Sequence, residues 1–303
     1  MQIVSCLDDL PYIADGVMTI GFFDGFHLGH RKIIDRIKAY SRHVVNRKKI
    51  VFTFSNHPIE VIHPERSPSF IQESNFKKTF LKKNEIDYLV MPTFTEEFAQ
   101  ISAKDFLSRV TRKFGFLKLI LGDNFRFGYK NLGNIDLIRN FVIDHPRFDL
   151  EVIYPVRYHH KIISSTLIRG WVKEGRFSDA AKVLNREFFI ENVVFQGERK
   201  GSKIGYPTAN IEIPEKQIVP RYGVYSGFVE IEDEKFKALI YVGTLKIKKN
   251  LKTPAVEAHI IDFDRDIYER KIRVYFSKWI REPVKIENLD QLKDLLEKDK
   301  KYL

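Results

Sequence analysis

The hydrophobic pattern of this chain of 303 residues changes near residue 184, and the change limits the folds that it can adopt. Before that point, short β-branched or aromatic runs alternate with amphipathic stretches of helical length. The apolar runs cover residues 17–23, 49–54, 86–92, 117–122 and 150–155, and the helix candidates cover 29–42, 73–83, 103–113 and 134–143. This alternation predicts an α/β doubly wound parallel sheet, which binds ligands beyond the carboxyl ends of its strands.

After residue 184, six strand candidates follow one another closely, separated by Gly, Pro and charged turns. This spacing favours an all-β six-stranded antiparallel barrel, with a sandwich as the alternative. The late run 288–298 predicts a C-terminal helix, because its leucines fall on one helical face. We therefore expect two domains, covering residues 1–183 and 184–303.

The composition excludes several classes of protein. The single cysteine, Cys6, excludes a disulfide framework and a cysteine-based metal site within one chain, and it favours a reducing cytoplasm. No apolar run approaches the roughly 20 residues of a membrane helix, and the acidic first residues argue against an export signal. The net charge of +11 suits nucleotide phosphates as well as nucleic acid, but the lysines are dispersed. We expect no nucleic-acid or membrane partner, and a monomer or weak homo-oligomer.

Residues 21–30 read GFFDGFHLGH and follow directly on the first apolar run. The glycines allow a tight turn, and the helix that follows offers its first N–H groups to an anion. His27 and His30 are three residues apart, so both imidazoles can face one ligand at the start of this helix. Two imidazoles there suit phosphate oxygens, with a metal site or a plain solvated helix start as the alternatives.

This string resembles the signature of the HxGH nucleotidyltransferases, which transfer a nucleotidyl group from ATP to a phosphate and release pyrophosphate. The resemblance implies a Rossmann-like first domain and no covalent enzyme intermediate. It implies that His27 and His30 are catalytic residues that bind the ATP phosphates around the transition state. Further ATP contacts are implied for Gly21, Phe23, Asp24, Gly25 and Gly29.

A second string of the first half, ISSTLIRGW, covers residues 163–171. Ser164, Ser165 and Thr166 are good helix N-caps, and Arg169 follows Thr166 by three residues, so it can lie near the same face. Beside the histidine string, this segment resembles the second phosphate-binding element of the superfamily. That likeness implies that Ser164, Ser165 and Thr166 bind ATP and that Arg169 is catalytic. A plain capped helix with a surface arginine is the alternative.

A third string, GDNFRFG, covers residues 122–128 and places two aromatic residues and an arginine between two glycines. Alternating aromatic residues lie by default in the core. Aromatic residues beside an arginine also suit a planar ring that carries a phosphate.

The second half carries a glycine-rich basic loop, GERKGSKIGYPTAN, over residues 197–210. Exposed N–H groups and cations in such a loop suit a polyphosphate. The glycines are Gly197, Gly201 and Gly205, and the cations between them are Arg199, Lys200 and Lys203. Thr208 and Asn210 lie two residues apart on one face of the following strand, and their oxygens suit Mg²⁺. An ordinary hairpin with a polar face is the alternative.

Glu257 lies within an apolar strand, between Val256 and Ala258. A carboxylate in such a position needs a partner or a role. With His259 on the same face, Glu257 can act as a general base that takes a proton from an alcohol. The structural alternative is a charge at the rim of the barrel, paired with a lysine.

In their order along the chain, these motifs resemble the bifunctional prokaryotic riboflavin kinase/FAD synthetase family, from about Val17 to about Asp299. The resemblance implies that the second half phosphorylates riboflavin to FMN with ATP, and that the first half adenylates FMN with a second ATP. The products are then FAD and pyrophosphate, with Mg²⁺ expected in both reactions. The implied kinase residues are the base Glu257, the metal ligands Thr208 and Asn210, and the ATP contacts Gly197, Gly201, Lys203, Gly205 and Pro207. The implied flavin contacts are Asn124, Phe125, Arg126, Phe127 and Arg281.

The chain departs from the family pattern mainly at residues 245–249, which read LKIKK where the family has a Pro-Thr pair, and at Glu269, where the family has Gly. These departures leave open an FMN adenylyltransferase with a weakened kinase half. A flavin-sensing regulatory binding protein is a further alternative. The presence of His27, His30 and Glu257 argues against such a regulator, because a binding protein needs no base.

Overall fold

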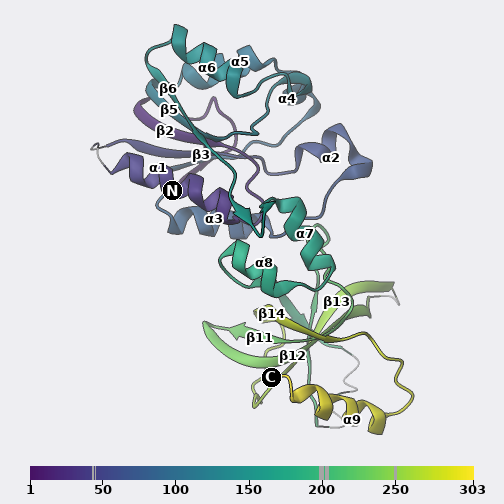
Figure 1. Ribbon diagram of the computed structural model, residues 1–303. Coiled ribbons are helices and arrows are strands. Elements are labelled where there is room, and N and C mark those ends of the chain that lie inside the picture. The colour runs from purple at the N-terminus through teal and green to yellow at the C-terminus, as the bar shows by residue number, and fades with distance from the viewer. Residues whose placement is uncertain (43, 45, 198–200, 202–204, 249–250) are drawn as a thin grey trace. The chain divides into compact units, whose positions relative to one another are not determined.

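The computed structural model describes residues 1–42, 44, 46–197, 201, 205–248 and 251–303. The chain divides into two compact units, Met1–Ser164 and Ser165–Leu303, each built on its own sheet (Figure 1). No helix within the described residues is long and apolar enough to cross a membrane.

The first unit is built on a six-stranded sheet in the order β1-β4-β3-β2-β5-β6, in which every neighbouring pair is parallel. Its strands are β1 (Gln2–Val4), β2 (Ile13–Ile20), β3 (Lys48–Phe52), β4 (Tyr88–Val90), β5 (Phe114–Gly122) and β6 (Phe148–Ile153). A short antiparallel pair, β7 (Arg157–Tyr158) and β8 (Lys161–Ile162), follows it. The predicted parallel sheet is confirmed.

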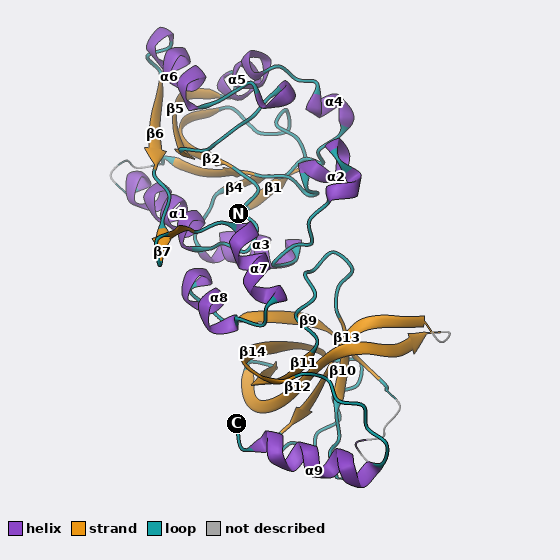
Figure 2. Ribbon diagram, turned by 45° about the vertical axis from the view of Figure 1, so that its right-hand side comes forward, coloured by secondary structure: helices purple, strands orange, loops and turns teal. Residues whose placement is uncertain are grey.

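Helices cover both faces of this sheet (Figure 2). Successive strand residues point to opposite faces, so Met18 packs in one core cluster with α5 (Ala103–Thr111) and α6 (Ile135–Asp144), while Val17 packs in the other with α1 (Leu28–Ser41) and α3 (Ser74–Lys83). The shorter helical segments are α2 (Pro58–Ile62), η1 (Pro64–Arg66), α4 (Glu96–Ala99) and η2 (Tyr129–Asn131).

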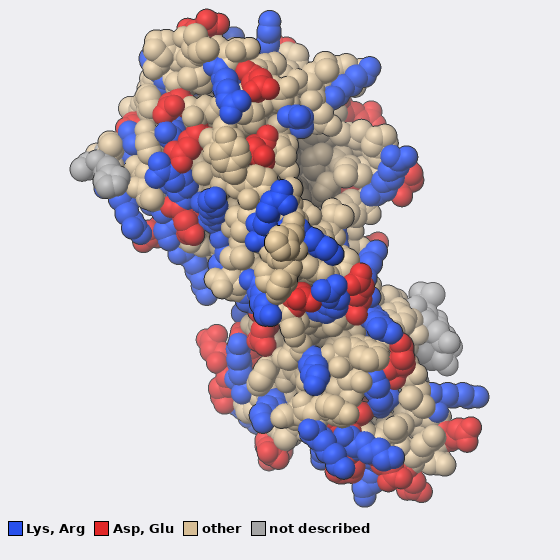
Figure 3. Space-filling view, viewed as in Figure 1, with Lys and Arg blue, Asp and Glu red and all other residues tan. Residues whose placement is uncertain are grey.

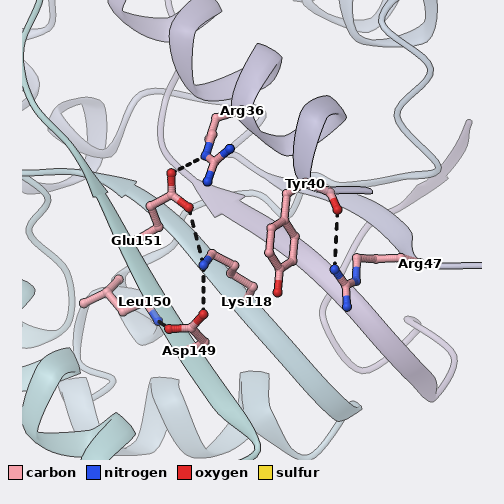
Figure 4. A network of polar contacts seen from close by, with 7 residues as sticks. All are labelled: Arg36, Tyr40, Arg47, Lys118, Asp149, Leu150 and Glu151. Atoms are coloured by element: carbon pink, nitrogen blue, oxygen red, sulfur yellow. Dashed lines mark hydrogen bonds and ion pairs between the residues drawn. The ribbon is translucent and has the colours of Figure 1, made fainter. Parts of the chain in front are cut away.

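A polar network ties helix α1 to the edge of the sheet (Figure 4). Lys118 on β5 donates to Asp149 on β6 at 2.8 Å and lies 3.4 Å from a carboxylate oxygen of Glu151. Glu151 also accepts from Arg36 on α1. The network therefore fixes the middle of α1, the helix that begins directly after His27.

The second unit is a closed antiparallel barrel of six strands in the order β10-β13-β12-β11-β14-β9. Its elements are α7 (Ser165–Lys173), α8 (Phe177–Leu184), β9 (Phe188–Phe195), β10 (Ala209–Glu212), β11 (Gly223–Ile231), β12 (Glu234–Lys248), β13 (Leu251–Ile260), β14 (Lys271–Arg281) and α9 (Leu289–Lys300). The predicted barrel and C-terminal helix are confirmed.

Helix α8 packs on the barrel through Phe177, which is 1% exposed. Its ring centroid lies 5.5 Å from that of Phe188, 5.3 Å from that of Tyr225 and 5.0 Å from that of Phe276, rings on three different strands. The division of the chain into compact units falls at residues 164/165, with α7 and α8 in the second unit, whereas the sequence pattern predicts a domain boundary at 183/184. The boundary at 183/184 stays a prediction.

Candidate active sites

The string 21–30 forms a tight turn between the end of β2 and the start of α1. Phe23 and Phe26 have φ angles of 55° and 47°, and Gly25 has a φ of 78°. The left-handed region is costly for phenylalanine, and such strain is typical of functional sites. A Cβ at Gly25 would lie 3.1 Å from the side chain of Ile71. Glycine therefore suits this position for two reasons, the positive φ and the lack of room for a side chain.

His27 and His30 lie together at the start of α1. His27 is the N-cap, and its Nδ1 accepts from the backbone N–H of His30 at 3.4 Å. The two rings are stacked, with centroids 3.7 Å apart. A Cβ at Gly29 would lie 3.2 Å from the His27 ring, so the glycine between them leaves room for this arrangement.

Burial keeps both imidazoles neutral at physiological pH. His27 is 6% exposed, and this burial lowers its pKa to about 4. Burial also lowers the pKa of His30 well below its usual value, and the neighbouring His27 and Lys77 lower it further. Nδ1 of His30 is buried and has no hydrogen-bond partner within the described residues. The pair therefore offers hydrogen bonds rather than formal charge to a ligand.

A cavity of about 830 Å³ opens in the first unit at the carboxyl ends of β2 and β5, and Figure 3 shows a hollow on this unit. Its volume lies in the usual range of small-molecule sites. The predicted residues that line it are Gly21, Phe23, His30, Asn124, Phe125, Arg126 and Phe127. The structure thus brings the histidine string and the string 122–128 to one cavity. His27, Asp24, Gly25 and Gly29 are not among its lining residues.

Most of the apolar lining of the cavity was not predicted from the sequence. Phe54 follows β3 and Phe94 follows β4, while Phe98 lies on α4 and Phe106 on α5. These residues read as ordinary core positions in the sequence. The sequence signal that could have identified them is their position after predicted strands, because segments that follow neighbouring parallel strands meet at one edge of the sheet.

Phe125 and Phe127 stack with centroids 5.3 Å apart, and Phe127 is 8% exposed. Phe127 is therefore both a core residue and a lining residue, so the two readings of this string are compatible. Gly128 has a φ of 72°, and a Cβ there would lie 2.6 Å from the backbone nitrogen of Ala103. The glycine lets the string return close to α5. Arg126 is exposed and donates to the Phe125 carbonyl at 3.3 Å.

The predicted second phosphate element lies where the two units meet in the chain. Ser164 ends the first unit, and Ser165, Thr166 and Arg169 belong to α7 of the second. Arg169 donates from Nη2 to Oγ1 of Thr166 at 3.3 Å, as their spacing on a helix allows. The role of these residues at the ATP phosphates stays a prediction.

In the second unit, the predicted base and metal ligands lie side by side. Glu257 on β13 is the register partner of Asn210 on β10, so both side chains project from the same face. Thr208, just before β10, donates from Oγ1 to Oε1 of Glu257 at 2.7 Å. Asn210 is 6% exposed, and Glu257 is half-buried. Hydroxyl, amide and carboxylate oxygens together are the hard donors that Mg²⁺ prefers, so this set fits the expected ion.

Two glycines of the loop 197–205, Gly197 and Gly201, lie where a side chain would collide, and Gly205 has a positive φ. A Cβ at Gly197 would lie 2.7 Å from Nδ2 of Asn210, and one at Gly201 would lie 2.2 Å from the carbonyl oxygen of Tyr206. Gly205 has a φ of 82°. The predicted ATP contact Lys203 and its neighbours Arg199 and Lys200 lie outside the described residues.

Helix α9 holds the segment that follows this loop, a link that the sequence did not indicate. Tyr206 donates its hydroxyl proton to Glu297, and the Lys300 ammonium lies 4.4 Å from the centre of its ring. His259 donates from Nδ1 to the Pro207 carbonyl at 2.9 Å. These contacts fix the backbone directly before Thr208.

Arg281, predicted to bind flavin, has a structural partner. Its guanidinium donates to both carboxylate oxygens of Asp299, at 3.0 and 2.7 Å, and Asp299 is 3% exposed. The pair joins β14 to α9. The flavin contact of Arg281 stays a prediction. Residues 245–248 belong to β12, but their side chains and residue 249 lie outside the described part.

Comparison with known proteins places both units in described families. A family model for FAD synthetase matches residues 11–167, and one for riboflavin kinase matches residues 184–303. The chain is 32% identical to a bifunctional riboflavin kinase/FMN adenylyltransferase of Buchnera aphidicola subsp. Schizaphis graminum, over 100% of this chain and 99% of that one. It is 28% identical to the protein of the same name from Bacillus subtilis, over 95% of this chain and 91% of that one.

A solved structure shares the fold along almost the whole chain. It is described as a macrolide-efflux protein from Streptococcus pneumoniae, and it matches with a TM-score of 0.88 at 27% identity. The match covers 99% of this chain and 97% of the other.

Proposed function

The chain belongs to the bifunctional riboflavin kinase/FMN adenylyltransferase family, and on that basis we propose that its barrel phosphorylates riboflavin and that its first unit adenylates the resulting FMN. The assignment of residues to the two sites is part of this proposal. It rests above all on one observation, which is that His30 and the string 122–128 line a single cavity. The resemblance gives these residues to ATP and to flavin, the two substrates of the second reaction.

In the first reaction, the ribityl 5′-oxygen attacks the γ-phosphorus of ATP, and the bond to the β-bridging oxygen breaks to release ADP. Glu257 orients the hydroxyl and accepts its proton. The hydrogen bond from Thr208 holds one carboxylate oxygen in place, so the other is left for the substrate. Mg²⁺, when bound, neutralises phosphate charge, and Thr208 and Asn210 would hold it.

In the second reaction, an oxygen of the FMN phosphate attacks the α-phosphorus of ATP, and pyrophosphate leaves. The nucleophile is already an anion, so no protein base is required. His27 and His30 are neutral, and they act as hydrogen-bond donors to oxygens that gain charge in the transition state. The resemblance also gives Ser164, Ser165, Thr166 and Arg169 a role at the ATP phosphates, as hydrogen-bond donors and, for Arg169, as a positive charge.

Two variants separate the sites. Glu257→Ala removes the base, and we expect it to abolish conversion of riboflavin to FMN while FMN is still converted to FAD. His30→Ala should do the reverse. Product chromatography of each purified variant with riboflavin or FMN, ATP and Mg²⁺ measures both steps. The two-site assignment is wrong if both variants impair both steps equally.

The wild-type protein tests the narrower alternative. Riboflavin that stays unchanged while added FMN is converted to FAD would mean that the substitutions at 245–249 have disabled the kinase half. We further propose a cytoplasmic location, because one unpaired cysteine suits a reducing compartment.

A further inference from the structure

Lys77 is a buried lysine to which the proposed reactions assign no role. It lies on α3 and is 8% exposed. Its ammonium donates to the carbonyl of Phe22 at 2.7 Å and to Oγ1 of Thr53 at 3.1 Å, and it lies 4.3 Å from the centre of the Phe22 ring. Thr53 in turn donates to the same Phe22 carbonyl at 3.1 Å. Burial of a charge costs free energy of folding, so a buried lysine with such specific partners indicates a role.

The turn and the segment before α3 are linked in both directions. Asp24, in the turn, accepts from the backbone N–H of Ile71 at 2.9 Å and from that of Gln72 at 3.4 Å. Lys77 reaches back from α3 to the backbone of the turn at Phe22. Two sets of hydrogen bonds thus join the turn to residues 71–77, one through the Asp24 carboxylate and one through the Lys77 ammonium. Phe22 lines the cavity together with His30, so this clamp fixes part of the cavity wall.

The charge of Lys77 also acts on His30, one member of the histidine pair. It lowers the pKa of His30, together with the burial of that ring. The imidazoles are neutral, whereas Lys77 is charged at neutral pH, because burial lowers its pKa only to about 8. On the neighbouring helix α1, Arg31 donates to the Phe26 carbonyl at 3.0 Å. Within the described residues, the titratable groups that interact electrostatically with Lys77 are Asp24 in the turn and His30 on α1.

We propose that Lys77 is a positioning residue of the adenylyl-transfer site, which occupies the Phe22 carbonyl and supplies fixed positive charge beside the neutral histidine pair. Without the ammonium, the Phe22 carbonyl would keep only its hydrogen bond from Thr53, and the turn that lines the cavity would lose a fixed positive charge. With it, the turn presents a more positive potential to the charge that develops on the phosphate oxygens. This inference rests on the proposed function of the first unit.

The test compares Lys77→Met with Lys82→Met, which removes an exposed lysine from the same helix. For Lys77→Met we expect kcat for FMN adenylylation to fall by about tenfold to a hundredfold, with the FMN dissociation constant nearly unchanged. Riboflavin phosphorylation by the same preparation should be unaffected. Lys82→Met should leave both reactions at the wild-type rate.

A pH profile adds a readout that a purely structural role would not move. For wild type, kcat/KM of FMN adenylylation should decline above about pH 8, where Lys77 loses its proton in the free enzyme. Lys77→Arg stays charged at higher pH, so this decline should disappear. A decline that persists unchanged in Lys77→Arg would overturn the inference. If Lys77→Met does not fold, the comparison of pH profiles between wild type and Lys77→Arg still tests the inference.

The outcomes separate the inference from the function on which it rests. If wild type makes no FAD from FMN, the proposed function fails, and the role of Lys77 fails with it. If wild type makes FAD and Lys77→Met makes it equally fast, only the role of Lys77 is wrong.

Discussion

The hydroxyl of Thr208 donates a 2.7 Å hydrogen bond to Oε1 of Glu257, from the segment before β10 to the middle of β13. The bond restricts the rotation of a carboxylate that is only half-buried. An unrestricted glutamate would lose side-chain entropy each time it engaged a substrate hydroxyl. The hydroxyl therefore prepares the carboxylate for its proposed task.

Replacement of Thr208 by valine keeps the shape of the side chain and removes this bond. We expect kcat of riboflavin phosphorylation to fall by about tenfold to a hundredfold, since general-base catalysis depends on geometry. Thr208→Ser keeps the hydroxyl and should retain most of the activity. The measurement is the initial rate of FMN formation, with FMN adenylylation as the internal control. Equal rates for the valine and serine variants would contradict the prediction.

Gly29→Ala should impair the adenylyl-transfer site with little effect on stability. Alanine favours a helix by about 1 kcal/mol, but its Cβ would press on the His27 ring from 3.2 Å. We expect the stacked histidines to shift and FAD formation from FMN to fall by about tenfold or more. Gly170→Ala is the matched control, because a Cβ there meets no atom within 4 Å. Full activity of Gly29→Ala would show that the site tolerates a displaced His27.

The pair of Arg281 and the buried Asp299 should be a main support of helix α9. Asp299→Asn leaves the arginine without its charge partner, and we expect a loss of about 3 kcal/mol in the free energy of unfolding of the second unit. Urea unfolding followed by tryptophan fluorescence measures it, because Trp171 and Trp279 both belong to this unit.

The control for this pair is Arg270→Gln, which breaks an ion pair to Glu232 in which both side chains are 65% exposed. An exposed pair of this kind contributes about 0.5 kcal/mol or less. If the two variants lose the same stability, the pair of Arg281 and Asp299 is not a support of α9.

His27 should make the first unit sensitive to acid. Its pKa is about 4 in the folded protein and 6.5 in the unfolded chain, so between these values only the unfolded chain takes up the proton. The stability of the unit therefore falls as the pH drops below 6.5 toward 4. His27→Asn keeps a good N-cap and removes the part of this dependence that comes from His27, while the part from the buried His30 remains in both proteins. At pH 5 we expect the wild type to have lost about 2 kcal/mol relative to pH 7 that the variant keeps.

Hydrogen exchange of the α1 backbone amides measures this difference, with wild type and variant compared at each pH. The intrinsic exchange rates then cancel. Equal protection factors at pH 5 and pH 7 in wild type would mean that the His27 ring gains a proton in the folded state as easily as in the unfolded chain.

The sequence predicted the elements that have a strong local period. Helices 29–42 and 103–113 correspond to α1 and α5, and the apolar run 117–122 falls within β5. The strand β1 and the helices α2 and α4 were missed, because three to five residues are too few to show a period. The turn 21–26 was recognised from its glycines, but the positive φ of Phe23 and Phe26 was not.

The candidate sites were predictable where motifs are contiguous and unpredictable where contacts are distant in the chain. Thr208 and Glu257 were both chosen from the sequence, but their hydrogen bond depends on the register of β10 against β13. Lys77 reads as one of several lysines of an amphipathic helix. Only the packing of α3 against the turn shows that its ammonium is buried.

Strand β10 has only four residues, yet it is paired with β13 on one side and with β9 on the other. Because successive residues of a strand face opposite ways, an insertion of a single residue between Ala209 and Asn210 would turn Asn210 away from Glu257 and push apolar neighbours outward. In an open sheet, an edge strand can shift its register because only one side of it is paired. In a closed barrel every strand is paired on both sides, so such a shift would break hydrogen bonds to a neighbour. Length changes during the divergence of related chains should therefore accumulate in the glycine segment upstream and stop at Thr208.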